Sequence, residues 1–283
     1  MDARLQRRVQ RYGWDRAVDD YEAGWQEQLE PAQRLMLEMA DLEPGNAVLD
    51  VACGTGLVTF RAAMQVGGRG SVVGTDISGE MVEAARRRSA ESGYANVRFE
   101  RGEAEDLGFG DTSFDVALCA LGLMYVPDPI RALRQMRRVL RPGGTAAVAV
   151  WGGRRACGWA GIFPIVDARV ASDVCPMFFH LGTGDALART FEAAGFAEPR
   201  VSRIGTELHY PTAEAALGAA FRGGPVALAY GRFDEATRAQ VHTEYLDSIA
   251  AYRRGDGYRI PGEFVVAAAR SSLAPMATGG MRQ

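Results

Sequence analysis

Short apolar segments alternate with amphipathic ones between Val48 and Val150, and this alternation determines the expected fold. Five segments have the length and composition of buried strands; they span residues 47–51, 71–75, 97–100, 114–119 and 145–150. Helical patterns lie between most of them, over residues 57–66, 79–92 and 128–140. The last of these helices has Asp128 as its predicted N-cap and Pro129 in its first turn, and it stops before Pro142-Gly143-Gly144. Such an alternation is typical of βαβ units, so we predict a mostly parallel sheet with helices on both faces.

An aromatic stripe precedes this core. Its members recur at spacings of four, three and four and so share one face of a helix; they are Trp14, Val18, Tyr21 and Trp25. Pro31 is predicted to open a second helix that ends near Glu43-Pro44-Gly45. The stripe either packs on the core or forms a roof over a ligand cleft.

The segments after the core predict two further strands, over residues 201–208 and 264–269, and hence seven in total. Residues 151–185 are irregular and apolar, 184–194 form a helix that stops at Gly195, and 213–254 form about two helices broken at residues 223–225. The expected organisation is an N-terminal helical cap (1–42), a core (43–151), the remaining strands with an inserted helical lid (152–270), and a disordered tail (271–283).

Composition restricts the class of partner and the compartment. The net charge of −3 and the pI of about 5.8 favour neither a nucleic acid nor an anionic membrane surface. All 32 basic residues are Arg, which indicates a GC-rich genome and rules out lysine chemistry. No apolar run approaches the ~18 residues of a membrane helix, and the N-terminus lacks a secretory signal, so we expect a cytoplasmic protein without stable membrane association. The four Cys and three His lack metal-ligand spacing, so we predict reduced thiols and no metal site.

The first predicted strand runs directly into a glycine turn, Val48-Leu-Asp-Val-Ala-Cys-Gly-Thr-Gly56. Glycines let the backbone turn sharply and approach a ligand, and the following helix offers free N–H groups. A dinucleotide fingerprint needs a third glycine, but Thr59 stands at that position, and Asp50 precedes the turn. An acid there suits a ligand with a cationic amino group better than a pyrophosphate.

Two further strand ends carry acids. The second strand ends at Asp76, where a carboxylate can accept both hydroxyls of a ribose, and the third is followed by Glu103 and Ala104, which can bind the edge of an adenine ring. Because the carboxyl ends of parallel strands lie at one edge of a sheet, these features predict one site for an adenosine group that needs no phosphate clamp.

The segments VLDVACGTG, VVGTDIS, RGEAEDL, SFDVALCALGLMYVPDP and VLRPGG resemble, in order and spacing over residues 42–150, the motifs of class I S-adenosylmethionine-dependent methyltransferases of the ubiquinone/menaquinone-biosynthesis type. The resemblance implies a Rossmann-like α/β fold, S-adenosylmethionine as cofactor and S-adenosylhomocysteine as product. It also implies the cofactor-binding residues, which are Asp50, Ala52, Gly54, Gly56, Asp76, Ile77, Met81, Glu103, Ala104 and Ala120. Tyr21 and Trp25 of the aromatic stripe complete the predicted cofactor site as its roof. Glu103 stands where the family more often has Asp. We expect Asp76→Ala to abolish cofactor binding and to leave the fold intact.

The reaction expected is in-line transfer of a methyl group to an O, N or C atom of a small-molecule acceptor. If the acceptor needs a base, His180 is the first candidate and Tyr125 the second. A homodimer is compatible with the sequence. Two alternatives stay open, namely a protein that binds S-adenosylmethionine as a regulator or for another reaction, and, less favoured, a nicotinamide-dependent oxidoreductase.

Overall fold

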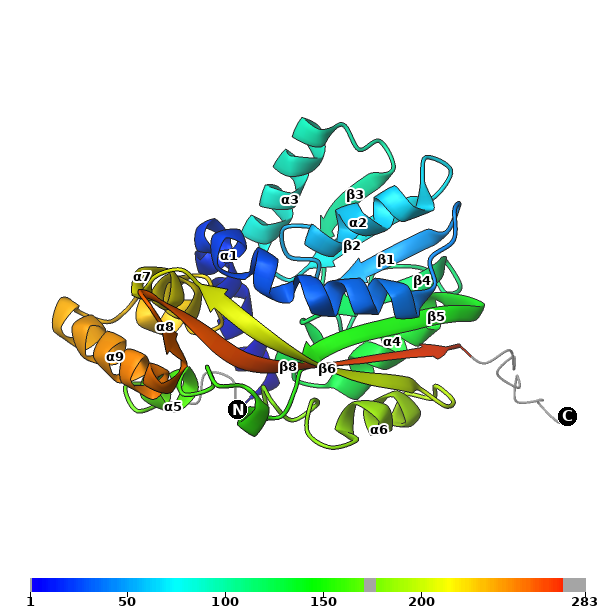
Figure 1. Ribbon diagram of the computed structural model, residues 1–283. Coiled ribbons are helices and arrows are strands. Elements are labelled where there is room, and N and C mark those ends of the chain that lie inside the picture. Colours follow the sequence, from blue (N-terminus) through cyan, green and yellow to red (C-terminus); the bar gives the residue numbers. More distant parts are fainter. Residues whose placement is uncertain (1, 171–176, 272–283) are drawn as a thin grey trace, which may run out of the picture.

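The computed structural model describes residues 2–170 and 177–271. Its centre is one sheet with the strand order β3-β2-β1-β4-β5-β8-β6, to which the two-residue strand β7 adds by pairing with β8 (Figure 1). Strands β1 to β5 pair in parallel, whereas β8 and β6 are antiparallel to their neighbours. The predicted α/β class and the mostly parallel seven-stranded sheet are therefore confirmed, with β7 as a small addition.

The strands begin and end close to the predicted positions within the core. Their bounds are β1 Ala47–Val51, β2 Ser71–Asp76, β3 Val97–Arg101, β4 Phe114–Ala120, β5 Leu140–Trp151, β6 Arg200–Tyr210, β7 Arg253–Arg254 and β8 Gly257–Arg270. Strand β5 starts five residues before the predicted position because the Pro142-Gly143-Gly144 segment is its irregular first part, with Gly143 at φ 81°. The predicted disordered tail beyond residue 271 lies outside the described residues.

The helices flank this sheet and build one lobe beside it. Their bounds are α1 Ala3–Ala40, α2 Leu57–Val66, α3 Gly79–Ser92, α4 Pro129–Val139, α5 Ile162–Asp167, α6 Ala186–Ala193, α7 Ala213–Leu217, α8 Ala227–Tyr230 and α9 Glu235–Ser248, with a π-helical turn Gly218–Arg222 and 3₁₀ turns Leu123–Tyr125, Arg154–Ala156 and Ala250–Tyr252. Figure 1 shows α1, α2 and α3 on one side of the sheet, α4 and α6 on the other, and α5, α7, α8 and α9 gathered in the lobe. Within the described ranges, no helix is long and apolar enough to cross a membrane.

The N-terminal helix α1 corrects the prediction of two helices, because it continues through Pro31 to Ala40. An interior Pro costs a helix about 3 kcal/mol. Its C-terminal half, however, buries Leu29, Met36 and Leu37 on the core, and full burial of such a side chain stabilises by about 1.5–3 kcal/mol. Packing on the sheet therefore outweighs the local preference of Pro31, and α1 ends at Asp41, which adopts a left-handed conformation.

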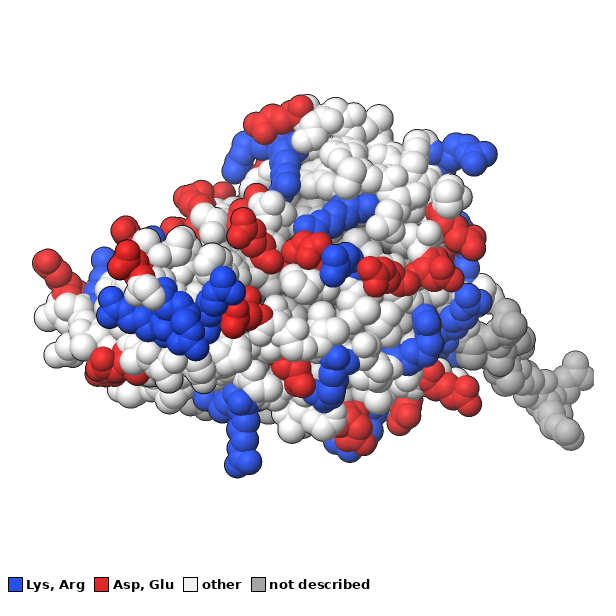
Figure 2. All heavy atoms as spheres, viewed as in Figure 1, with Lys and Arg blue, Asp and Glu red and all other residues white. Residues whose placement is uncertain are grey.

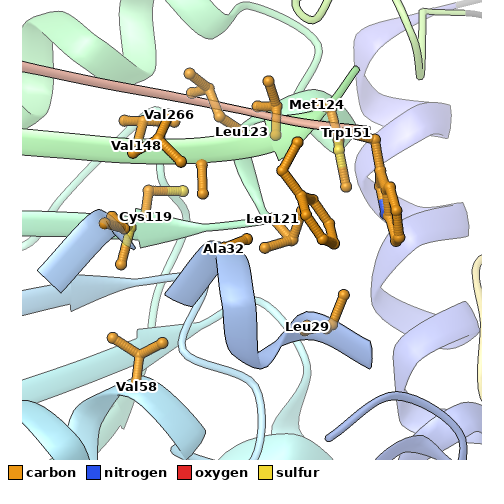
Figure 3. Close-up of a cluster of buried hydrophobic side chains, with 14 of the residues drawn as sticks. Leu29, Ala32, Val58, Cys119, Leu121, Leu123, Met124, Val148, Trp151 and Val266 are labelled. Atoms are coloured by element: carbon orange, nitrogen blue, oxygen red, sulfur yellow. The ribbon is translucent and has the colours of Figure 1, made fainter. Parts of the chain in front are cut away.

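The core continues from the sheet into the contact with α1. Figure 3 shows Leu29 of α1 on the same side of the sheet as Leu121 and Trp151, which follow β4 and end β5. The central strands carry small, fully buried residues, such as Ala147 and Ala149 of β5. Small side chains there let α1 lie close to the sheet, directly beside the carboxyl ends of the strands.

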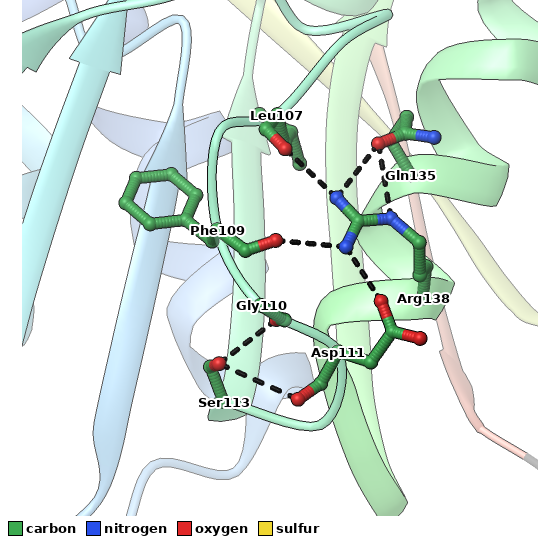
Figure 4. Close-up of polar contacts among 7 residues, drawn as sticks. All are labelled: Leu107, Phe109, Gly110, Asp111, Ser113, Gln135 and Arg138. Atoms are coloured by element: carbon green, nitrogen blue, oxygen red, sulfur yellow. Dashed lines mark hydrogen bonds and ion pairs between the residues drawn. The ribbon is translucent and has the colours of Figure 1, made fainter.

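Arg138 at the end of α4 fixes the loop between β3 and β4 (Figure 4). Its guanidinium donates to the backbone oxygens of Leu107 at 2.8 Å and Phe109 at 2.7 Å, and pairs with Asp111 at 2.7 Å. The planar guanidinium has five N–H donors in a fixed geometry, so one side chain can bind several acceptors along the loop. The loop that carries Glu103 and Ala104 into the site is thus anchored at its far end.

Candidate active site

A cavity of about 770 Å³, which includes space open to solvent, lies at the carboxyl ends of the parallel strands. Its wall comes from α1 and from the segments that follow β1, β2, β3 and β4. The lining residues are Arg7, Gln10, Trp14, Tyr21, Ala52, Gly54, Asp76, Ile77, Met81, Gly102, Glu103, Ala104, Glu105, Ala120, Leu121, Gly122, Tyr125, Val126 and Pro127. This is the position at which open α/β sheets bind ligands.

Asp76 organises the glycine turn as well as the cavity wall. Its two carboxylate oxygens accept hydrogen bonds at 2.9 Å, one from the backbone N–H of Gly54 and one from that of Ser78. Burial raises the pKa of Asp76, although these N–H donors oppose the effect. The turn needs glycine at its end: Gly56 has φ 89°, and a Cβ there would lie 2.8 Å from the ring of Phe60.

Asp50 lies beneath the turn and does not line the cavity. Its side chain accepts a 2.6 Å hydrogen bond from the hydroxyl of Thr59, whereas its other oxygen, Oδ1, has no partner among the described residues. Burial, reinforced by the charge of Asp76, raises the pKa of Asp50 to about 7. Asp50 therefore supports the turn through Thr59, and its unpaired oxygen Oδ1 is enclosed beneath the turn.

The end of the cavity beside β3 contains two glutamates and one arginine. Glu103 and Ala104 line it as predicted, but Glu103 lies 3.4 Å from the guanidinium of Arg7, which belongs to α1. Arg7 also donates a 2.8 Å hydrogen bond to Glu105, whose side chain is 4% exposed. The N-terminal helix thereby covers the acidic end of the cavity.

A second chamber, of about 340 Å³ including space open to solvent, adjoins the first and is almost entirely aromatic and aliphatic. It is lined by Trp14, Tyr21, Trp25, Leu29, Leu121, Met124, Tyr125, Trp151, Trp159, Phe178 and Pro225. Of these, four also line the first cavity, namely Trp14, Tyr21, Leu121 and Tyr125. All four tryptophans of the chain line this second chamber, and none of its lining residues, which all belong to the described ranges, is acidic, basic or a histidine.

The structure brings most of the predicted cofactor residues together. On the wall of the first cavity are Tyr21, Ala52, Gly54, Asp76, Ile77, Met81, Glu103, Ala104 and Ala120. Asp50 lies beneath the turn instead, Gly56 ends the turn without lining the cavity, and Trp25 lines the second chamber only. Of the two candidate bases, Tyr125 lines both spaces.

His180 does not reach either space. Its side chain is exposed and it is absent from both linings, whereas Phe178, two residues earlier, is buried and lines the chamber. Residues 177–180 form a turn, in which successive side chains point in different directions. The aromatic neighbours of His180 therefore give no information about its own position.

Sequence reasoning missed Arg7, Gln10 and Glu105 on the cavity wall. A signal for the first two exists, because Arg7, Gln10 and Trp14 follow one another at spacings of three and four and so extend the aromatic stripe toward the N-terminus. No local pattern distinguishes Glu105 from Glu103.

The cavity fits an adenosyl group attached to an amino acid. An acid that can hold ribose hydroxyls stands at the end of β2, a small residue and an acid follow β3, and the glycine turn with the unpaired Asp50 oxygen lies at the end of β1. The wall between them is apolar, with Ile77, Met81 and Ala120. The fold and the site together indicate a methyltransferase that binds S-adenosylmethionine.

Comparison with known proteins agrees with this class. Residues 42–154 match a family described as "Methyltransferase domain". The chain is 32% identical over 260 residues to nocamycin O-methyltransferase of Saccharothrix syringae, with 86% of this chain and 91% of that protein covered. It is 44% identical over 117 residues to the ubiquinone/menaquinone biosynthesis C-methyltransferase UbiE of Ectopseudomonas mendocina, which covers 41% of this chain and 46% of that protein.

Two solved structures share the fold. The YcgJ protein of Bacillus subtilis superposes with a TM-score of 0.61 at 20% identity and covers 87% of this chain and 100% of its own. The [4+2]-cyclase SpnF superposes with a TM-score of 0.56 at 21% identity and covers 89% of this chain and 83% of its own.

The chain belongs to the class I S-adenosylmethionine-dependent methyltransferases, of the type related to the ubiquinone/menaquinone-biosynthesis enzymes. It is an enzyme that uses S-adenosylmethionine to methylate a small molecule.

Proposed function

We propose that the enzyme methylates a hydroxyl oxygen of a neutral, flat acceptor that occupies the aromatic chamber beside the cofactor cavity. The observation that carries the proposal is the chamber itself, which is lined by four tryptophans and by no charged residue of the described ranges. A charged acceptor would lose its hydration there without a partner of opposite charge, which costs several kcal/mol. The relative named as an O-methyltransferase, which aligns over most of both chains, supports oxygen as the atom methylated.

The cofactor residues keep the roles that the sequence suggested, as part of this proposal. Asp76 would hold the ribose, Glu103 and Ala104 the adenine edge, Ile77 and Met81 the sides of the adenosine, and Ala120 the methionine chain. Gly54 and the Asp50 oxygen below it would face the amino acid end. Tyr21 and Trp14 close this space from α1. When bound, S-adenosylmethionine supplies an electrophilic methyl group on a positively charged sulfur.

The residues that line both spaces determine how the acceptor meets the methyl group. Trp14, Tyr21 and Tyr125 place aromatic rings at the junction, with Trp14 in edge-to-face contact with Tyr21 at 5.8 Å and with Tyr125 at 5.2 Å. Aromatic faces attract a cation and exclude water, so they favour a sulfonium group in this position. The fixed rings restrict the acceptor to one approach, which is the main requirement of an in-line displacement.

The two tyrosine hydroxyls differ in what they can do with a proton. Burial, together with the negative charge of Asp76, raises the pKa of Tyr21, so this hydroxyl stays protonated and acts as a donor. We assign Tyr125 to hold the acceptor hydroxyl and to accept its hydrogen bond as the oxygen bonds to the methyl carbon and releases its proton to solvent. S-adenosylhomocysteine is then the product.

We expect the enzyme to act on a small molecule and not on a nucleic acid. We also expect it to work in the cytoplasm. Acidic and basic side chains are interspersed over most of the face shown in Figure 2, apart from one compact basic cluster on the lobe at its left, which fits the net charge of −3. A homodimer stays compatible with the sequence.

The test measures release of S-adenosylhomocysteine with three kinds of acceptor at equal concentration. These are hydroxylated bicyclic aromatics that stay neutral at pH 7, such as 5-hydroxy-2,3-dimethyl-1,4-naphthoquinone, the same compounds without the hydroxyl, and charged amines such as phosphoethanolamine. We expect product with the first group alone. Turnover confined to the amines would contradict the proposal, and cofactor binding without turnover of any acceptor would favour a non-methylating role for the scaffold.

A further inference from the structure

The indole nitrogen of Trp159 is a buried hydrogen-bond donor without a partner in the described structure. The residue is 3% exposed, and its indole lines the aromatic chamber. Trp25, which lines the same chamber, donates its indole N–H to the backbone oxygen of Ala219 at 3.2 Å. A buried donor left unsatisfied is costly, so the difference between the two tryptophans needs a cause.

Neighbouring rings hold the Trp159 indole in place. Its centroid lies 4.9 Å from that of Trp151, 5.8 Å from that of Trp25 and 5.5 Å from that of Phe178, in edge-to-face contacts. The backbone before it is fixed as well, since Gly158 donates to the backbone oxygen of Pro261 at 2.8 Å. The indole therefore has no freedom to turn toward a protein acceptor, and its N–H keeps one direction.

We propose that Trp159 donates this hydrogen bond to a carbonyl oxygen of the methyl acceptor, and so selects acceptors that carry a carbonyl group beside the hydroxyl that is methylated. The proposal rests on the chamber being the acceptor site. An indole N–H can only donate, so its partner must be an oxygen with a free lone pair. A carbonyl provides this without bringing a second donor into an apolar space.

The positions of Tyr21, Tyr125 and Trp159 give the methyl acceptor a defined orientation. Tyr21 and Tyr125 line both the cofactor cavity and the chamber, whereas Trp159 lines the chamber and not the cofactor cavity. A planar molecule that spans the chamber places its hydroxyl at the tyrosines and its carbonyl at Trp159. Quinones with a phenolic hydroxyl on the second ring have this arrangement and stay neutral, and simple phenols lack the carbonyl.

The experiment compares two ligands of nearly equal size in the presence of S-adenosylhomocysteine. They are 5-hydroxy-2,3-dimethyl-1,4-naphthoquinone and 6,7-dimethyl-1-naphthol, which has the same hydroxyl and methyl groups but no carbonyl; both are neutral at pH 7. The four indole N–H signals are recorded by ¹H–¹⁵N NMR and assigned with single Trp→Phe variants. We expect the Trp159 indole proton to move downfield with the quinone and not with the naphthol, because a carbonyl hydrogen bond deshields the proton.

Affinities of the variants give the second measurement. Trp159→Phe should weaken quinone binding about tenfold more than naphthol binding, as expected for loss of one hydrogen bond in an apolar site. Trp25→Phe is the matched control, since its N–H already has a protein partner, and should weaken both ligands to the same extent. Calorimetric binding of S-adenosylhomocysteine shows whether each variant is folded. If Trp159→Phe does not bind it, the shift of the Trp159 indole signal in the unmodified enzyme decides whether Trp159 donates to the carbonyl.

The outcomes separate this inference from the proposed function. If both ligands bind but the Trp159 signal stays in place, or both lose affinity equally in Trp159→Phe, the role of Trp159 is overturned while the chamber remains the acceptor site. If neither ligand shifts any indole signal, the chamber does not bind flat aromatic acceptors and both proposals are overturned.

Discussion

Arg7 donates a 2.8 Å hydrogen bond from Nε to a carboxylate oxygen of Glu105, and this ion pair joins the N-terminal helix to the loop after β3. Glu105 is buried and accepts a second hydrogen bond, at 3.0 Å, from the backbone N–H of Asp128 at the start of α4. The hydrogen bond to Glu105, with the negative charges of Glu105 and Glu103, raises the pKa of Arg7. One buried carboxylate thus connects three segments around the cofactor cavity.

Replacing Arg7 by Met should loosen this closure. Glu105 would keep only the Asp128 N–H, and a buried carboxylate that loses its charged partner destabilises a protein by about 1–3 kcal/mol. We expect the free energy of unfolding to fall by that amount in urea titrations. Calorimetry should show roughly tenfold weaker binding of S-adenosylhomocysteine, because α1 no longer covers the acidic end of the cavity.

Arg34→Met is the matched control on the same helix. Arg34 lies 3.8 Å from Glu38, and both side chains are more than 60% exposed. Removing such a surface pair should change stability by less than about 1 kcal/mol and leave cofactor affinity as it was. Equal effects of the two substitutions would show that the Arg7 pair does not close the site.

Asp76→Asn should reduce affinity for S-adenosylhomocysteine by at least about tenfold, because the ribose ligand loses its charge. The structure also changes the expectation for Asp76→Ala. Since Asp76 accepts from Gly54 and Ser78, Ala would leave two N–H groups without their partner and destabilise the glycine turn by about 1–3 kcal/mol for each. Asp15→Asn is the control. Asp15 accepts a hydrogen bond from the hydroxyl of Ser78 but does not line the cavity. Unchanged affinity of Asp76→Asn would remove Asp76 from the ribose site.

The strands and helices between residues 47 and 151 could be predicted closely because local chemistry defines them. Helix α2, for example, has the predicted bounds, and Gly56 and Gly67 stand directly before and after it. The same glycine turns and strand ends also indicated Gly54 and Asp76, because a parallel sheet brings the ends of its strands to one edge. The lining of the first cavity is predictable for this reason.

The aromatic chamber beside the cofactor cavity could not be predicted in the same way. Trp25, Trp151 and Trp159 come from a helix, a strand end and a loop, and only the packing of α1 on the sheet brings their rings within 6.0 Å of one another. The prediction that a second helix begins at Pro31 was wrong for a related reason. The burial of α1 on the core stabilises the continuous helix by more than an interior Pro destabilises it. Tertiary contacts decide both cases, and no short sequence window contains them.

Asp50 should make stability depend on pH in a defined range. Its pKa is about 7 in the folded protein, against an ordinary value of 3.8. An acid whose pKa rises on folding takes up a proton as the chain folds, so its stabilising contribution is complete below pH ~4 and is lost as the pH rises to about 7. Asn at this position can still accept from Thr59 but cannot ionise.

The free energy of unfolding of Asp50→Asn, relative to the unmodified enzyme, should therefore increase between pH 5 and 7 by up to about 1.4 kcal/mol per pH unit and level off above. Urea titrations at pH 5, 6, 7 and 8 measure this difference. Asp19→Asn, at an exposed position of α1, should show a constant difference over the same range. A constant difference for Asp50→Asn as well would mean that Asp50 is ionised in the folded protein throughout.

Tyr125→Phe and His180→Ala distinguish the two bases that the sequence suggested. Tyr125 lines both the cofactor cavity and the acceptor chamber, whereas His180 is exposed and lines neither. With a hydroxylated acceptor, Tyr125→Phe should lower kcat about tenfold, as expected for loss of the hydrogen bond that orients the acceptor hydroxyl, and leave affinity for S-adenosylhomocysteine within twofold. Its ring should remain in place, since the contacts with Trp14 and Phe178 involve the ring itself. His180→Ala should keep kcat within twofold; a large loss there, with Tyr125→Phe fully active, would move the proton-accepting role to the segment around His180.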